Sequence, residues 1–266
     1  MGTSFYLGDL NNIPFKDAKF AGGLIYRYNF SSRFALKANI LFGNIAGADK
    51  KNPIRIINED GNIISDSSGR GLSFSSPFTE ISAQFEINFF TLYNIEHKNQ
   101  IAPYLFGGVA LFSYNPKAVY PKNGNTYDLQ PIGTEGQGRE GKSKKYPLTG
   151  VGIPFGIGFK ANFGRYVCIG AEWGLRFTFT DYLDDVGGLY YNFEEDKTIP
   201  AASREIIEYF GDPSIPKHNY NSQRYSTKKT DWYSFAGIFI TVRIGNEDRI
   251  CDIKTKLKKS KLVRKR

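Results

Sequence analysis

The chain has 266 residues, of which 41% are hydrophobic and 15% aromatic, and its formal net charge is +9 at pH 7. No run of ~18 apolar residues occurs, which excludes a transmembrane helix but not a transmembrane barrel, whose strands are individually weak signals. The two cysteines, Cys168 and Cys251, lie too far apart for a metal or redox motif, and only two histidines are present, so we expect no zinc or haem cofactor.

Alternation of apolar and polar residues predicts eight strands along the chain. In chain order they span residues 2–10, 20–30, 34–44, 78–90, 101–114, 148–163, 166–185 and 232–244. The connections between them alternate in length. Residues 11–19, 48–71, 117–147 and 186–230 form long connections, whereas 31–33, 91–100 and 164–165 form shorter ones. Within the last long connection, the spacing of Ile206, Ile207 and Phe210 predicts a short helix over 203–210.

The clearest signal is the hairpin whose arms are residues 148–163 and 166–185. Ordinary strands have ~5 to 6 residues, whereas a strand that crosses a bilayer obliquely needs ~9 to 11. One face of the first arm is bulky, from Val151 to Phe163, and the other face is mostly glycine. Since a small closed barrel has a cramped interior, we expect the glycine face to point inward and the bulky face to meet lipid. For residues 101–114 the alternation is too poor to assign faces.

Eight charged residues fall on the inward faces of the predicted strands. They are Arg27, Lys37, Glu80, Glu86, Lys160, Glu172, Arg176 and Arg243. These charges could line a conductive pore or form an interior network of ion pairs. We favour the network, because eight strands leave room only for side chains and each buried charge requires a partner. Glu172 and Arg176 lie four residues apart on one strand, so Glu80 or Glu86 is expected to complete the set.

An even number of strands with alternating long and short connections is typical of an outer-membrane barrel. The predicted fold is therefore an all-β, eight-stranded antiparallel transmembrane β-barrel over residues 1–244, with long extracellular loops, short periplasmic turns and both termini in the periplasm. Aromatic residues near the turn ends would form an interfacial girdle. They are Tyr26, Tyr28, Phe30, Phe34, Phe89, Phe90, Phe163 and Tyr166. Because the N-terminus lacks the pattern of an export leader, we expect that a leader was removed or that the true start lies upstream.

Two local patterns are candidate ligand sites. Residues 136–143 match the phosphate-loop pattern G-x-x-x-x-G-K-[ST], but a strand rather than a helix follows, so we expect a solvated loop and no nucleotide. Asp181, Asp184 and Asp185 could bind a cation, because Ca²⁺ prefers clustered carboxylates, or could brace the loop. Their spacing does not match an EF-hand, and bracing is the favoured interpretation.

Several segments resemble the PorG-like outer-membrane β-barrel family of the Bacteroidota, which is associated with the type IX protein secretion system. They are YLGDLNN near the start, PYLFGGVALFSYNPKA at 103–118, YDLQPIGTEGQG at 127–138, IPFGIGFKANF at 153–163, IGAEWGLRFTFTDYLDDVGGLYY at 169–191 and DWYSFAGIFI at 231–240. The resemblance implies an eight-stranded barrel without catalysis or cofactor that anchors or docks a periplasmic lipoprotein or ring protein of the secretion machine. A short first strand and a basic C-terminal extension depart from the family pattern.

That extension, residues 245–266, has nine basic and three acidic residues and is expected to be disordered. It could only solubilise the chain, or it could dock an acidic face of a periplasmic partner through a basic set. The set is Lys254, Lys256, Lys258, Lys259, Lys261, Arg264, Lys265 and Arg266. Two alternatives stay open: an adhesin-like barrel that binds through residues 186–230, and an outer-membrane protease or acyltransferase, for which His218 is the candidate in the outer loops. Nothing in the pattern indicates nucleic-acid binding.

Overall fold

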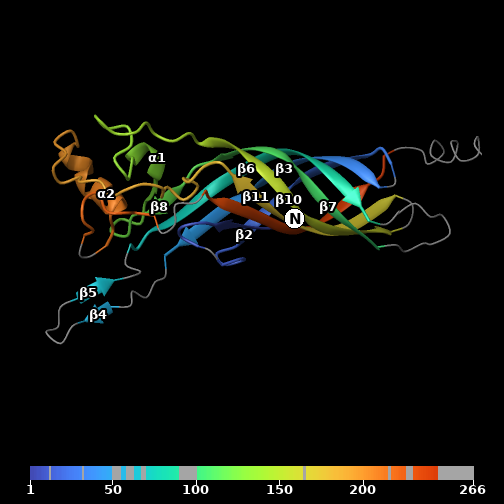
Figure 1. Ribbon diagram of the computed structural model, residues 1–266, viewed down its shortest axis with the longest axis horizontal. Coiled ribbons are helices and arrows are strands. Elements are labelled where there is room, and N and C mark those ends of the chain that lie inside the picture. Colours follow the sequence, from blue (N-terminus) through green and yellow to red (C-terminus); the bar gives the residue numbers. More distant parts are fainter. Residues whose placement is uncertain are drawn as a thin grey trace, which may run out of the picture.

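In the computed structural model, eight antiparallel strands close into a barrel, as the alternation predicts (Figure 1). The structure describes residues 1–11, 13–31, 33–49, 55–57, 63–66, 70–89, 101–163, 166–214, 217–225 and 230–244. The barrel strands are β1 (Gly2–Leu7), β2 (Lys19–Asn29), β3 (Phe34–Ala48), β6 (Ser73–Asn88), β7 (Ile101–Tyr114), β10 (Thr149–Phe163), β11 (Val167–Thr178) and β12 (Trp232–Val242). Each pairs with its sequence neighbours in the barrel, and β1 pairs with β12 to close the wall.

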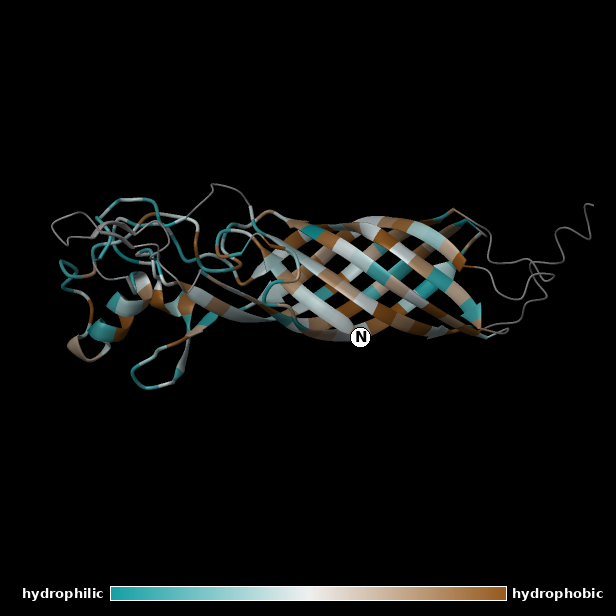
Figure 2. Ribbon diagram, turned by 90° about the horizontal axis from the view of Figure 1, so that it is seen from below, coloured by the Kyte–Doolittle hydropathy of each residue, from teal (hydrophilic) through white to brown (hydrophobic). Residues whose placement is uncertain are grey.

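Strand β1 is short and joins its two neighbours unequally. All six of its residues pair with β12, whereas only Gly2, Thr3 and Ser4 pair with β2. The N-terminus consequently lies midway along the barrel (Figures 1 and 2).

The smaller elements gather at one end of the barrel (Figure 1). They are the hairpins β4 (Arg55–Ile57) with β5 (Ile63–Asp66) and β8 (Lys117–Val119) with β9 (Thr126–Asp128), and the helices α1 (Leu129–Ile132) and α2 (Ala201–Gly211). Helix α2 confirms the helix expected over 203–210. Within the described residues, neither helix is long and apolar enough to span a membrane.

Three strand boundaries differ most from the prediction. β3 and β6 stay paired as far as Ala48 and Ser73, so both extend further toward the long loops than expected. The predicted strand over 166–185 is too long, because β11 ends at Thr178. There the Asp231 carboxylate accepts the backbone N–H of Leu183 at 2.9 Å, and this contact holds the chain in a turn.

The faces predicted for six strands, β2, β3, β6, β10, β11 and β12, are those of the structure, and the wall shows alternating hydropathy along its strands (Figure 2). Outward apolar residues such as Leu24, Ile81 and Ile240 are exposed, while inward residues such as Asn39 and Gln84 are buried. β7, for which no faces were assigned, is apolar on both sides. Its inward side carries Ala102, Tyr104, Phe106, Ala110, Phe112 and Tyr114, and its outward side carries Ile101, Leu105, Val109 and Leu111.

The aromatic rings of β7 fill the barrel because glycines lie opposite them. Tyr104 packs over Gly158, and Phe106 packs over Gly156 and Gly174, so closely that a Cβ at any of these glycines would lie within 2.7 Å of the ring atoms. In the described part of the interior we find a cavity of about 10 Å³, lined in part by Glu80 and Tyr233. A cavity of this size holds at most about one water molecule, so the interior is a packed core.

Candidate functional site

The predicted interior charges form ion pairs in three groups. At the turn half of the barrel, Arg27 Nε lies 3.0 Å from Glu86 Oε2, and Lys160 also pairs with Glu86. At mid-height Lys37 pairs with Glu172, which accepts a hydrogen bond from Tyr104 Oη at 2.8 Å. Each group therefore places opposite charges in contact inside the wall.

Nearest the loops, Arg176 Nε lies 3.1 Å from Glu80 Oε2, and Tyr233 Oη donates to the same carboxylate oxygen at 3.0 Å. Glu172 and Arg176 therefore do not pair mainly with each other: Glu172 pairs with Lys37, and Arg176 pairs with Glu80. Glu80 is one of the two carboxylates that were expected to complete the set. Arg243 is half-buried at the turn end, where its backbone N–H donates to Tyr166 O at 2.7 Å.

The described loop residues 115–148, 179–214 and 217–225 form what we call the loop cap, at the end of the barrel that carries α1 and α2 (Figure 1). One apolar cluster runs from the barrel into this cap. It includes Phe78, Phe112 and Tyr233 from the barrel strands, and Leu129, Leu183 and Phe210 from the loops. Because the cluster is continuous, the loop cap and the barrel share one core.

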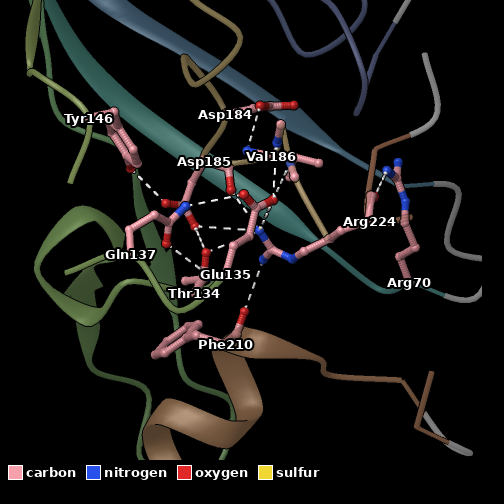
Figure 3. A network of polar contacts seen from close by, with 12 residues as sticks. Arg70, Thr134, Glu135, Gln137, Tyr146, Asp184, Asp185, Val186, Phe210 and Arg224 are labelled. Carbon is pink, nitrogen blue, oxygen red and sulfur yellow. Dashed lines mark hydrogen bonds and ion pairs between the residues drawn. The ribbon is translucent and has the colours of Figure 1, made fainter. Parts of the chain in front are cut away.

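Arg224, which is 2% exposed, is the central contact of the loop cap (Figure 3). Its Nη1 donates to Thr134 Oγ1 at 3.0 Å and to the Asp185 backbone oxygen at 2.6 Å, and lies 3.3 Å from Glu135 Oε1. Its Nη2 donates to Phe210 O at 3.1 Å. One guanidinium thus joins the connection after β9, the connection after β11 and the end of α2.

The three predicted aspartates have different roles. Asp185 accepts hydrogen bonds from Thr134 Oγ1 at 2.5 Å and Tyr146 Oη at 2.6 Å, and burial raises the pKa of Asp185 to about 6. Asp184 accepts from Tyr6 Oη at 2.6 Å. Asp181 is partly buried, and desolvation together with nearby carboxylates raises its pKa to about 7.

Asp184 and Asp185 therefore brace the loop. Within the described residues, no three His, Cys, Asp or Glu side chains converge closely enough to hold a metal ion.

Residues 1–195 match the family model described as "Domain of unknown function (DUF6089)". The chain belongs to the DUF6089 family. The DUF6089 match contains seven barrel strands, β1 to β11, together with Thr134, Glu135 and Asp185, whereas Arg224 and β12 lie beyond it. Searches of the curated proteins and of the solved structures find no match to the chain.

Sequence reasoning missed Asp231, which lies beyond the DUF6089 match. Its Oδ1 contacts Tyr6 Oη at 2.7 Å, and its Oδ2 accepts the Leu183 N–H. A single aspartate before a strand gives no periodic signal. Its partners come from the first strand and from the connection after β11, so only the closed barrel brings them together.

Asp212, Ser214 and His218 form a cluster in the loop cap of this DUF6089 chain. Ser214 Oγ lies 2.8 Å from His218 Nδ1, and Asp212 Oδ2 lies 3.1 Å from the same nitrogen. A Ser-His-Asp triad places the serine and the carboxylate on opposite nitrogens of the ring. Asp212 also accepts the backbone N–H groups of Ser214 and His218, at 3.0 and 2.6 Å, so its geometry is that of a loop brace.

The phosphate-loop-like segment 136–143 forms an irregular turn. Gly136, Gly138 and Gly141 all have positive φ, and the Gly138 N–H donates to Ser143 O at 2.7 Å. Strand β10 rather than a helix comes next after Ser143, and Lys142 Nζ lies over the Tyr191 ring, 5.3 Å from its centroid. The arrangement lacks the helix N-terminus that a phosphate loop uses. The basic residues proposed for partner docking, Lys254 to Arg266, lie outside the described residues.

Proposed function

We propose that this protein is a non-enzymatic outer-membrane barrel that anchors or docks periplasmic components of a type IX protein secretion machine. The observation that carries the proposal is the distribution of side chains across the wall. Large apolar residues are exposed on the outside, with Leu24 71%, Val109 62% and Ile238 65% exposed, whereas the paired charges lie inside. Soluble proteins rarely expose so extensive an apolar surface, and lipid is the simplest partner for it.

Aromatic residues at the turn end support an interfacial anchor. Phe34 lies 5.7 Å from Phe85 and 6.5 Å from Phe30, centroid to centroid, and all three rings are exposed. Girdles of aromatic residues flank the apolar band of membrane barrels at both interfaces. The other predicted girdle residues in the described part of the chain are exposed as well, and Phe90 lies outside it.

The packed interior favours an anchoring role over transport. Ion pairs and aromatic rings fill the space that a solute would need, and the cavity in the loop cap beside Arg224 is only about 20 Å³. That volume accommodates about one water molecule. The assignment to secretion comes from the resemblance of the strand and loop segments to the PorG-like family. The proposed position of both termini in the periplasm rests on the even number of strands and on the short turns at that end.

The test combines a deletion with a salt series. Full-length protein and a variant lacking residues 251–266 would be cross-linked in intact envelopes and recovered, at low salt and at 1 M salt. Docking through exposed basic residues should weaken at 1 M, where the Debye length falls to ~3 Å. Recovery of periplasmic secretion components by the full chain, reduced by either change, supports the proposal. Equal recovery by both proteins at both salts removes the tail from the docking site, and absence of any periplasmic partner contradicts the docking function.

The adhesin-like alternative has one observation in its favour. The loop cap is not a set of separate loops but an extension of the barrel core, held by Arg224 and Glu135, and could present a rigid binding surface. The same cross-linking experiment separates the two functions, because an adhesin would be recovered with partners from the cell exterior.

A further inference from the structure

At the barrel mouth, one tyrosine hydroxyl lies between two buried carboxyl groups. Tyr6 Oη is 2.6 Å from Asp184 Oδ2 and 2.7 Å from Asp231 Oδ1. Asp184 and Asp231 are 1% and 0% exposed. The remaining oxygens are also occupied, since Asp184 Oδ1 accepts the Val186 N–H at 3.0 Å and Asp231 Oδ2 accepts the Leu183 N–H at 2.9 Å.

The number of hydrogens at this site is too small for two ionised carboxylates. A tyrosine hydroxyl carries one hydrogen and can donate to one acceptor only. Tyr6 Oη already accepts the Asp9 N–H at 2.8 Å. Contacts of hydrogen-bond length to both carboxyl groups therefore require a second hydrogen, and a protonated carboxyl group is its available source.

The charged surroundings favour this protonated state. Asp9, from the connection after β1, and Asp181, from the connection after β11, add negative charge near the pair, while Arg70, before β6, is the cation that opposes them. Arg70 also binds Asp49, at 2.6 Å. Tyr114 of β7, whose hydroxyl donates to Pro147 O at 3.0 Å, is a further titratable group near the pair.

On the far side of the connection after β11, Arg224 is bound to Asp185 and Glu135. Burial raises the pKa of both carboxyl groups of the pair, and Asp184 raises that of Asp231 further.

We propose that Asp184 and Asp231 share one proton through Tyr6, and that this proton holds the loop cap on the barrel. Asp184 belongs to the loop cap, whereas Tyr6 lies in β1 and Asp231 is the residue immediately before β12. Without the shared proton, two carboxylates would face each other with one hydrogen between them. The closed cap binds one proton more than an open cap, so closure is strongest in mild acid and weakens as the pH rises.

The first test detects the proton directly. Folded protein would be measured by infrared spectroscopy at pH 8.5, where the carbonyl stretch of a protonated carboxylic acid is distinct from that of carboxylates. Asp185 and Asp181, with pKa values of about 6 and about 7, are mostly ionised at that pH and contribute little. A protonated-acid band in the wild type that disappears in Asp184→Asn or in Asp231→Asn supports the proposal. A wild type without the band, or a band that persists in both variants, overturns it.

The second test measures cap opening by hydrogen exchange of the Leu183 and Val186 amides, which bond to the two carboxyl groups. After correction for the intrinsic exchange rate, wild-type protection should fall about tenfold per pH unit between pH 7.5 and 8.5, since one proton is released on opening. Asp231→Asn, whose amide supplies the missing hydrogens, should remove this dependence. Asp212→Asn, at a loop brace outside the pair, should retain it.

Protection that does not vary with pH in the wild type overturns the proposal. The heat-modifiable mobility of each variant on a gel verifies that the barrel itself has folded. The infrared and hydrogen-exchange measurements do not depend on the secretion role. The shared proton and the docking function can therefore be contradicted separately.

Discussion

Tyr104 of β7 and Gly158 of β10 are register partners, and the tyrosine ring occupies the space that a side chain at position 158 would need. A Cβ there would lie 2.3 Å from Tyr104 Cζ. We therefore expect Gly158→Ala to destabilise the folded barrel by ~1 to 3 kcal/mol, as overpacking of a filled core does. Equilibrium unfolding in urea, from lipid vesicles or micelles, would measure this change in the free energy of unfolding.

The matched control is Gly107→Ala on the neighbouring strand. Gly107 faces outward, and a Cβ there would meet only Pro154 O, at 3.8 Å. This variant should stay close to the wild type. Equal effects of the two substitutions would show that loss of glycine itself, rather than the Tyr104 ring, is responsible.

The ion pair of Lys37 and Glu172 predicts a second stability effect. Glu172→Ala leaves the Lys37 ammonium, which is fully buried, without its carboxylate, so we expect a loss of ~3 to 5 kcal/mol. In the double variant Lys37→Met/Glu172→Gln both charges are absent, and the introduced amide oxygen can still accept from Tyr104. That variant should recover most of the loss in the same unfolding assay. A loss below ~1 kcal/mol in Glu172→Ala would mean that water solvates the site.

The proposed lipid contact predicts that the cost of an outward charge depends on depth. Val109, near the middle of β7, and Ile101, at its turn end, are both exposed apolar residues. Val109→Arg should cost ~2 to 4 kcal/mol in lipid, whereas Ile101→Arg should cost ~0 to 1 kcal/mol near the interface. Unfolding measured from vesicles provides the comparison. Indistinguishable small effects at both positions would indicate that the wall faces water.

The filled interior predicts that the barrel does not conduct. Eight strands enclose only enough room for side chains, and here the ion pairs and aromatic rings occupy it. Recordings from purified protein in planar bilayers should show no sustained openings of porin size. Stable large channels from the pure monomer would contradict the packed core.

Arg224 predicts that the loop cap can be loosened without unfolding the barrel. Arg224→Met removes the donor to Thr134, Asp185 and Phe210, and it leaves Glu135 buried without its cation. We expect the loop cap to become sensitive to added protease while the barrel keeps its heat-modifiable mobility. Lys122→Met, at a cap position that is 69% exposed in its side chain, is the control and should stay resistant.

The periodic part of the fold could be predicted from the sequence because side chains in a strand alternate between two faces. This rule predicted the eight strands, the faces of six of them and the inward position of residues such as Lys37 and Glu80. It failed for β7 because its inward residues are as apolar as its outward ones. The rings of Tyr104 and Phe106 fill space left by glycines on other strands, and a single strand does not contain that information.

The loop cap was mostly beyond prediction for a different reason. The bracing role favoured for Asp184 and Asp185 matches their contacts, but the side chains that donate to them, Tyr6, Thr134 and Tyr146, are distant in sequence and were not predicted. Arg224 and Asp231 gave no signal, because their partners lie in segments that have no periodicity and are distant in sequence. Arg224 lies 90 residues from Thr134, and Asp231 lies 225 residues from Tyr6. Such contacts depend on the complete topology.

The contact of Tyr6 with Asp231 has a consequence for the order of assembly. Tyr6 is in the first strand and Asp231 immediately precedes the last, so their contact cannot form before the two ends of the sheet have met. Asp184 joins them only then, which makes an ordered surface at the loops a product of completed closure. In a barrel that has not closed, the loops would lack these contacts and would be accessible to proteases. In a closed barrel, the contacts would protect them. Order in the loops therefore reports that the barrel has closed.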